Sequence, residues 1–184
     1  MIITKYTYRM QLFIAVILFI ITIVFVNGCG KSVSDNFGMP INDFIAEYNK
    51  CAEKTFPGNS DFYKIHTSNI EKQVDGIVAG LKCNRVVTIT YNNKGMADTI
   101  RVRGYVRTAN EIRTFHRVCI LTMMVIEPGK DVNAYSNTFK ELVKNADFDK
   151  KPSKFVSGPI EYSITSNAGW WTFYAMTTET AKKN

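Results

Sequence analysis

Apolar and polar side chains recur with two different periods along this chain, and each period predicts a different kind of element. Between residues 41 and 54 the apolar positions return every three or four residues, which predicts an amphipathic helix. Pro40 precedes this helix, where its missing amide proton costs nothing, and the turn signal Pro57-Gly58-Asn59 ends it. The apolar stripe consists of Ile41, Phe44, Ile45, Tyr48 and Cys51.

A period of two is typical of the next part of the chain. Arg85–Tyr91 is rich in β-branched side chains, and the turn residues at 92–95 predict a hairpin with a second strand over Thr99–Arg107. Two candidate short strands precede this hairpin, Phe62–Ile65 and Gly76–Leu81.

The strand over 99–107 has two chemically different faces. One face carries the apolar residues Ile100, Val102 and Val106. The other face carries Arg101, Arg103, Tyr105 and Arg107. Such alternation is typical of an antiparallel sheet with one covered and one exposed face.

Helical patterns return in the second part of the chain. Residues 110–126 begin with a helical pattern and end in a stretch that is apolar nearly all round, and their length favours one buried helix over a strand. Asp131–Ala146 is predicted to be an amphipathic helix, and a polar linker follows at 147–152. The chain then closes with a hairpin, in which alternation at 160–164 and a strand over 170–176 flank the turn Asn167-Ala168-Gly169.

The order of these elements is helix, strands, helices, hairpin. Because strands and helices form separate blocks, the pattern predicts an α+β fold with helices packed on one face of an antiparallel sheet.

The N-terminal segment has a pattern of its own. Lys5 and Arg9 precede an apolar run at residues 12–26, which leads directly into Val26-Asn27-Gly28-Cys29. As a helix, the 15 residues of the run would span about 22 Å, short of a bilayer core of about 30 Å. The arrangement fits the hydrophobic region of a cleaved secretory signal.

This segment resembles the signal and lipobox of bacterial lipoproteins. The resemblance implies that residues 1–28 are removed and that Cys29 carries a diacylglyceryl anchor, which would tether the protein to a membrane on the periplasmic side. Gly30, in place of the Asp that retains lipoproteins in the inner membrane, favours the outer membrane. Asn27 departs from the small residue usual at its position. The alternative is an uncleaved membrane anchor.

The domain organisation follows from these patterns. We expect a signal peptide at 1–28, a flexible tether at 29–38, a single domain at 39–179 and a disordered tail at 180–184. The formal net charge is +7 and falls to +5 when Lys5 and Arg9 are removed with the signal. Such a charge biases a protein towards acidic partners. The basic residues are scattered and the protein is expected to be exported, so nucleic acid is not an expected partner.

Three cysteines remain beyond Cys29. In an oxidising envelope, Cys51 and Cys83 are the candidate disulfide because they flank the most irregular part of the chain. Cys119 lies in an apolar run and is expected to pack as a small hydrophobic residue. The alternative is three reduced, buried cysteines. No cysteine has the spacing of a metal site or a CxxC motif.

Motifs of enzymes are absent from the sequence. His66 and His116 are its two histidines, and neither belongs to a GxSxG, HExxH or Walker pattern. We therefore expect no catalytic residue, no metal site and no cofactor, and each histidine is expected to be exposed or hydrogen-bonded. Catalytic sites can also be assembled from scattered residues, which keeps an envelope hydrolase as an alternative.

The strongest candidates for a binding role are Arg101, Arg103, Tyr105 and Arg107. They project to one side of their strand at about 7 Å intervals, where guanidinium groups can bind carboxylates or phosphates of a partner. Arg113 and Arg117 are predicted to extend this patch. The alternative is an ordinary exposed face whose arginines pair with nearby acids.

The pair Trp170-Trp171 next to Gly169 is the second candidate for binding. Neighbours on a strand point in opposite directions, so one tryptophan is expected in the core and the other exposed. An exposed tryptophan beside a turn is typical of a binding hot spot. The alternative is that a helix or loop covers both tryptophans.

Together, these features predict a lipid-anchored envelope protein that acts as a non-catalytic binding module for another protein. Roles of this kind are an immunity or inhibitor protein, an exclusion factor, or an assembly protein. A structural, pilot-type lipoprotein of an outer-membrane complex is the alternative from a different class.

Overall fold

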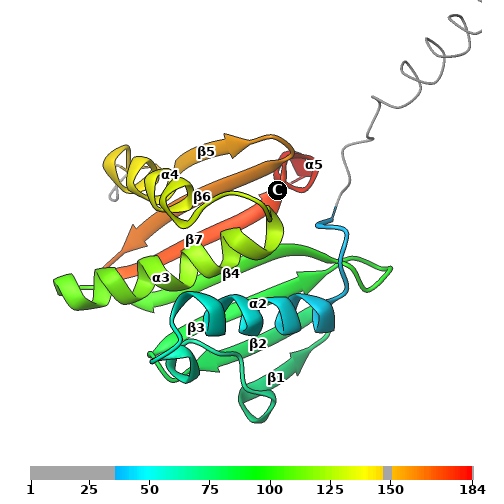
Figure 1. Cartoon of the computed structure of the whole chain (residues 1–184). Coiled ribbons are helices and arrows are strands. Elements are labelled where there is room, and N and C mark those ends of the chain that lie inside the picture. Colours follow the sequence, from blue (N-terminus) through cyan, green and yellow to red (C-terminus); the bar gives the residue numbers. More distant parts are fainter. Residues whose placement is uncertain (1–35, 147–150, 184) are drawn as a thin grey trace, which may run out of the picture. The chain divides into compact units, whose positions relative to one another are not determined.

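The computed structural model describes residues 36–146 and 151–183, and the predicted signal, Cys29 and most of the predicted tether lie outside these ranges. The described part is an α+β domain built on one antiparallel sheet with the strand order β1-β2-β3-β4-β7-β6-β5 (Figure 1). The predicted fold class is therefore confirmed.

The helices and strands alternate in blocks along the chain. The helices are α2 (Ile41–Thr55), α3 (Ala109–Ile126), α4 (Val132–Lys144) and α5 (Thr178–Lys183), with short 3₁₀ turns η1 (Ser60–Phe62) and η2 (Thr67–Asn69). The strands are β1 (Ile70–Gln73), β2 (Gly76–Leu81), β3 (Arg85–Tyr91), β4 (Ala97–Tyr105), β5 (Ser153–Ser157), β6 (Ile160–Asn167) and β7 (Trp170–Thr177).

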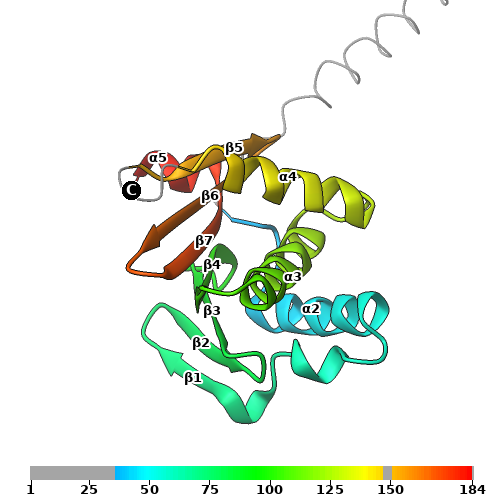
Figure 2. The same cartoon turned by 90° about the vertical axis from the view of Figure 1, so that its left-hand side faces the viewer.

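Three helices form a layer on one face of the sheet. Figure 2 shows α2, α3 and α4 side by side on the same side of the strands. The core lies between the two layers, and its largest fully buried side chains include Phe44, Tyr48, Tyr63, Phe115, Tyr162 and Phe173. We call the opposite face, on which Arg101, Arg103 and Trp170 are exposed, the uncovered face of the sheet.

The helix α3 occupies the middle of this layer, between α2 and α4, which explains why its second half is apolar nearly all round. A capping box fixes its first turn. The Thr108 hydroxyl accepts a hydrogen bond from the Glu111 amide at 3.2 Å, and the Glu111 carboxylate accepts one from the Thr108 amide at 2.8 Å.

The carboxylate of Glu127, just after α3, ties this helix to the strands at the far edge of the sheet. It accepts hydrogen bonds from the hydroxyls of Ser157, at 2.8 Å, and Tyr162. Lys130 adds an ion pair at 3.0 Å. The β5–β6 hairpin is thereby held against the end of α3.

The topology divides the domain into two halves, each with a helix, a run of antiparallel strands and a second helix. The first half runs from α2 through β1, β2, β3 and β4 to α3, and the second from α4 through β5, β6 and β7 to α5, so the first half has one strand more. The last strands of the two halves, β4 and β7, pair in the middle of the sheet. This seam brings residues of both halves next to each other on the uncovered face.

Several predicted elements differ from the structure. The predicted strand over Phe62–Ile65 is wrong, because η1 occupies its start and the backbone of Ile65 bonds to the Asn49 side chain (2.8 and 2.9 Å) and to no strand. The edge strands β1 and β5 were not predicted. The described residues of the predicted tail, up to Lys183, form the end of α5.

The three described cysteines are free thiols, so the predicted disulfide between Cys51 and Cys83 is not formed in the structure. Cys83 points into the core from the turn between β2 and β3 and is 4% exposed. Burial raises the pKa of its thiol to about 11. Cys119 is fully buried, as expected from its apolar run.

Candidate partner-binding face

The central strands bring the predicted binding residues together on the uncovered face of the sheet. In β4, Ile100 and Val102 point into the core, which directs Arg101, Arg103 and Tyr105 to the other side. The register pairs Tyr105 with Trp170 on β7, so the last predicted residue joins the group. We refer to Arg101, Arg103, Tyr105, Arg107 and Trp170 as the arginine face.

Cationic and aromatic groups alternate across the arginine face. The Arg103 guanidinium lies 4.9 Å from the centroid of the Trp170 ring, and the Arg107 guanidinium lies 4.6 Å from that of Tyr105. The two rings contact each other, with 5.4 Å between centroids. A guanidinium stacked on a ring keeps its N–H groups free in its own plane, so it can still donate to a carboxylate.

A pocket of about 340 Å³ opens on this face. Arg101 and Arg103 line it from β4, and Trp170, Thr172 and Tyr174 line it from β7. The remaining lining residues are Thr165, Asn167 and Ala168, from β6 and the β6–β7 turn. The pocket therefore combines two cations, an exposed aromatic ring and several hydroxyl and amide groups.

The wall of the pocket is fixed by the β6–β7 turn. Ala168 and Gly169 have φ values of 49° and 83°, the backbone of a two-residue type I′ hairpin. The Gly169 carbonyl accepts a hydrogen bond from the Val106 amide at 2.8 Å. A Cβ atom on Gly169 would lie 3.0 Å from the Tyr105 ring, so the turn is in close contact with that ring. The wall is thus formed before any ligand arrives.

Within residues 36–146 and 151–183, no acidic side chain forms an ion pair with Arg101, Arg103 or Arg107, the arginines of this face. Arg101 instead donates to the Thr88 hydroxyl at 3.3 Å. The Glu161 carboxylate on β6 is engaged by Lys154 at 2.8 Å. The arginines therefore do not pair with acids of their own chain within the described ranges.

The predicted extension of the patch through Arg113 and Arg117 is wrong. Both belong to α3, which lies on the helix side of the sheet. Arg117 donates to the Tyr63 hydroxyl at 2.8 Å and lies 5.1 Å from the Phe56 ring centroid. It is part of the packing between α3 and the segment after α2.

The tryptophan pair divides as expected. Trp171 is partly buried and packs against the core on Phe115, with 5.9 Å between ring centroids. Trp170 is 43% exposed and borders the pocket.

Sequence reasoning missed the part of the pocket that β6 and β7 supply. Thr165, Thr172 and Tyr174 lie opposite the apolar positions Ile164 and Phe173, so the alternation in the last hairpin already placed them on the uncovered face. What the sequence did not contain was the pairing of β4 with β7, which joins these residues to the arginines.

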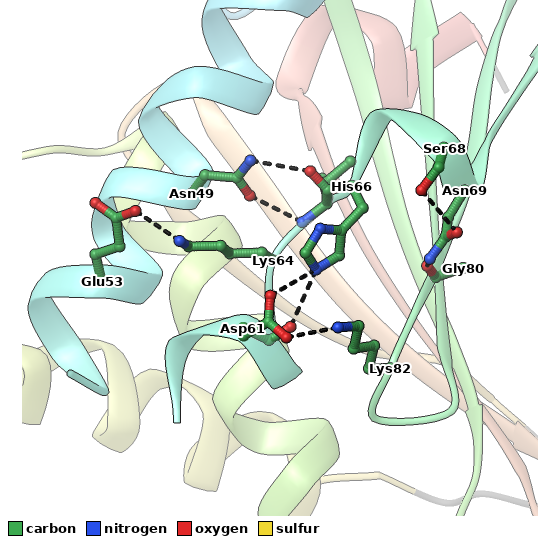
Figure 3. Close-up of polar contacts among 10 residues, drawn as sticks. Asn49, Glu53, Asp61, Lys64, His66, Ser68, Asn69, Gly80 and Lys82 are labelled. Atoms are coloured by element: carbon green, nitrogen blue, oxygen red, sulfur yellow. Dashed lines mark hydrogen bonds and ion pairs between the residues drawn. The ribbon is translucent and has the colours of Figure 1, made fainter. Parts of the chain in front are cut away.

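His66 belongs to a second polar cluster, at one end of the helix layer (Figure 3). Its Nε2 atom lies 3.1 Å from a carboxylate oxygen of Asp61, whose other oxygen is 2.6 Å from the Lys82 ammonium. Lys64 pairs with Glu53 at 2.6 Å. These contacts join α2, η1 and the end of β2, and the Asp61–Lys82 pair holds the pKa of the exposed Asp61 carboxyl below its usual value. A nearby hollow of about 320 Å³ is lined by residues 57–62 and Lys82.

His116 lies between α3 and α4. Its Nε2 atom is 3.3 Å from the Ser136 hydroxyl, and its ring packs on Phe139 at 4.6 Å between centroids. Burial, followed by the charges of Lys140 and Arg117, lowers the pKa of the imidazole. A serine nucleophile normally has a histidine oriented by a carboxylate, whereas the charged groups acting on this ring are cations.

Comparisons of the chain with protein-family models, curated proteins and solved structures found no match. Across residues 36–146 and 151–183, no helix combines the length and apolar character needed to cross a membrane. In the same ranges, no three His, Cys, Asp or Glu side chains are grouped so that they could hold a metal ion. The arginine face and its pocket are the site that the geometry of this chain supports best.

Proposed function

We propose that this protein is a lipid-anchored envelope protein that acts as a non-catalytic binding module. In this proposal, Cys29 carries the lipid anchor, and the arginine face docks an acidic surface of a protein partner on the periplasmic side. Immunity or inhibition, exclusion, and assembly of a surface apparatus are the roles that fit such a module.

The observation that carries the proposal is the gathering, around one preformed pocket, of an exposed tryptophan and guanidinium groups that form no ion pair within the described ranges. Trp and Arg are the residue types most enriched at binding hot spots. Because the β6–β7 turn and the stacked rings already fix the wall, little side-chain freedom is lost when a partner binds. Unpaired positive charge also speeds encounter with an acidic surface.

The N-terminal pattern supports the anchoring part of the proposal. Two or more acyl chains on a cysteine hold a protein firmly on a membrane, whereas a single chain gives marginal binding. Confinement to one membrane raises the effective concentration of a protein and its partner, so a modest affinity of the arginine face suffices.

Charge reversal at the arginine face tests the docking part. The variant Arg101→Glu/Arg103→Glu is compared with the parent and with Arg113→Glu, a matched control on the exposed side of α3. Each protein carries a C-terminal tag, is crosslinked in the native envelope, and is pulled down for mass spectrometry. We expect the dominant partner to be lost from the double variant and kept by the control, with both variants folded by circular dichroism. Equal capture by the double variant and the control would refute docking through this face.

The same sample tests the anchor. The mass of the N-terminal peptide should correspond to a chain that begins at an acylated Cys29. A free N-terminus at Met1 would refute the lipoprotein assignment while leaving the docking test intact.

A further inference from the structure

The two pocket arginines point to different neighbours of their strand. Arg101 and Arg103 are separated by one residue on β4, which places their Cα atoms about 7 Å apart on the same face. The Arg101 guanidinium donates a hydrogen bond of 3.3 Å to the Thr88 hydroxyl on β3. The Arg103 guanidinium lies over the Trp170 ring on β7, 4.9 Å from the ring centroid. Since β3 and β7 flank β4 on opposite sides, the two guanidiniums diverge. Two guanidiniums that point apart can each bind a separate anionic group. A single small anion would fit two guanidiniums that point towards each other.

From this geometry, and resting on the function proposed above, we infer that the arginine face recognises an extended acidic segment of the partner protein with carboxylates on alternate residues. In an extended chain, side chains at i and i+2 project to the same side about 7 Å apart, which matches the spacing of the Cα atoms of Arg101 and Arg103. Adjacent acids project to opposite sides, so only one of them can reach the face.

The chemistry of the pocket fits such a segment. Each carboxylate can accept charge-assisted hydrogen bonds from one guanidinium, which are shorter and stronger than bonds between neutral groups. The hydroxyls of Thr165 and Thr172 and the amide of Asn167 line the same space and can bond to the peptide backbone. Trp170, 43% exposed, offers apolar surface to the residue beside an acid. The volume of about 340 Å³ has room for a few side chains and not for a folded element.

Two capped peptides of identical composition and charge test the inference. One has the sequence Ser-Glu-Thr-Glu-Thr-Ser, with alternating acids, and the other Ser-Glu-Glu-Thr-Thr-Ser, with adjacent acids. Each is titrated calorimetrically at low ionic strength into the acylated, detergent-solubilised chain, and inorganic phosphate is titrated as a third probe. We expect the alternating peptide to bind at least about fivefold more tightly than the adjacent one.

Variants assign the difference to the two arginines. Arg101→Gln and Arg103→Gln should each remove most of the preference for the alternating peptide, and Arg113→Gln should keep it. Equal affinities for the two peptides, binding of neither, or tighter binding of phosphate would each overturn the inference. If the envelope partner is nevertheless lost on charge reversal, the proposed docking function stands and only the extended segment is wrong. If capture survives charge reversal, the docking function itself fails.

Discussion

The guanidinium of Arg103 lies over the indole ring of Trp170, 4.9 Å from its centroid, at the border of the pocket on the uncovered face. The two residues come from β4 and β7, the strands that join the two halves of the domain. The ring therefore both orients the cation and offers its own surface to a ligand.

Trp170→Ala is expected to weaken partner binding by about tenfold or more, because it removes the aromatic anchor and frees the Arg103 side chain. Cation–π contacts at exposed sites contribute about 0.5–1 kcal/mol, so the free energy of unfolding in urea should change by about 1 kcal/mol or less. Trp170→Phe keeps a ring under the guanidinium and should retain most of the binding. Loss of binding together with a large loss of stability in Trp170→Ala would show that the ring is structural.

Gly169→Ala is expected to disturb the pocket through the β6–β7 turn. Its φ of 83° strains any residue with a Cβ, and that atom would lie 3.0 Å from the Tyr105 ring. Gly158→Ala is the matched control, since Gly158 also has a positive φ of 55° but no atom within 4 Å of an added Cβ. Left-handed backbone should cost each variant about 1–2 kcal/mol in urea unfolding. Weaker binding should appear in Gly169→Ala alone, and equal binding by the two variants would contradict a role for the turn.

Gly104→Ala tests the packing beneath the arginine face. Gly104 points to the helix side, where an added Cβ would lie 2.3 Å from Cδ of the buried Arg85. The guanidinium of Arg85 is held by the carbonyls of Asn84 at 2.8 Å and Glu111 at 2.9 Å, so its stem has little room to move. We expect a loss of about 1–3 kcal/mol in the free energy of unfolding. Gly80→Ala, with open space around the added atom, should change it far less, and comparable losses would contradict the clash.

The capping box at the start of α3 predicts a pH effect. Hydrogen bonds from the amides of Arg107 and Thr108 lower the pKa of the exposed Glu111 carboxyl. A carboxyl with a lower pKa in the folded state contributes stability above its unfolded pKa, about 4.3, and that contribution is lost as the pH falls through the folded value. Glu111→Gln should therefore flatten the acid end of the stability curve measured by urea unfolding. Curves of equal steepness below about pH 4 would contradict this.

Thr108→Ala removes the other half of the same box. Loss of an N-cap side chain costs about 1 kcal/mol of stability. Because the Thr108 hydroxyl also donates to the Glu111 carboxylate at 3.0 Å and helps to lower its pKa, Thr108→Ala should in addition weaken part of the pH effect expected for Glu111. Urea unfolding at neutral pH measures this loss, and no loss would show that the cap is dispensable.

The burial of His116 predicts an effect on stability at a higher pH than the effect of Glu111. Burial between α3 and α4, with the charges of Lys140 and Arg117, lowers the pKa of its imidazole below the ordinary value of 6.5. The unfolded chain then binds a proton more readily than the folded one, so stability should fall as the pH drops below about 6.5 and level off below the folded pKa. An NMR titration of the ring protons should give a midpoint under 6.5. A midpoint above that value would contradict the burial of the ring.

Much of the fold could be predicted because its elements carry strong periodic patterns. The first helix was predicted over 41–54 and runs from Ile41 to Thr55, and the strands at 76–81 and 85–91 have the predicted bounds. The strand predicted at 99–107 lies at Ala97–Tyr105. A register shift between Thr90 and Tyr91 pairs Tyr91 with Ala97, so the strand begins earlier than predicted, and it ends just before Thr108, the N-cap of α3.

The elements that escaped prediction lack such patterns. The strand β1 has the sequence Ile-Glu-Lys-Gln and lies at the edge of the sheet, where it pairs with β2 only. None of its side chains is fully buried, so its sequence shows no alternation of apolar and polar residues. The segment after η1 does alternate, because Tyr63 and Ile65 are both buried, yet Asn49 satisfies the backbone of Ile65 in place of a strand. The alternation of apolar residues indicates which side chains are buried, but it does not indicate which groups form the hydrogen bonds of the backbone.

The sequence was enough to predict which individual residues belong to the candidate site. It was not enough to predict that they line a common pocket. The alternation in β4 was enough to place Arg101, Arg103 and Tyr105 on one face. Their position next to Trp170 depends on the pairing of β4 with β7, which no local pattern encodes because 64 residues lie between the end of β4 and the start of β7. The same long-range arrangement carries α3, with Arg113 and Arg117, to the opposite side of the sheet.

Because β4 belongs to the first half of the domain and β6 and β7 to the second, the pocket exists only when both halves are folded against each other. A compound that occupies it binds the native state alone and shifts the folding equilibrium by mass action, by about 2.7 kcal/mol at a concentration of one hundred dissociation constants. The melting temperature thereby becomes a readout of occupancy that needs no knowledge of the natural partner. A thermal-shift screen of acidic peptides can search for that partner through the stability of the domain itself.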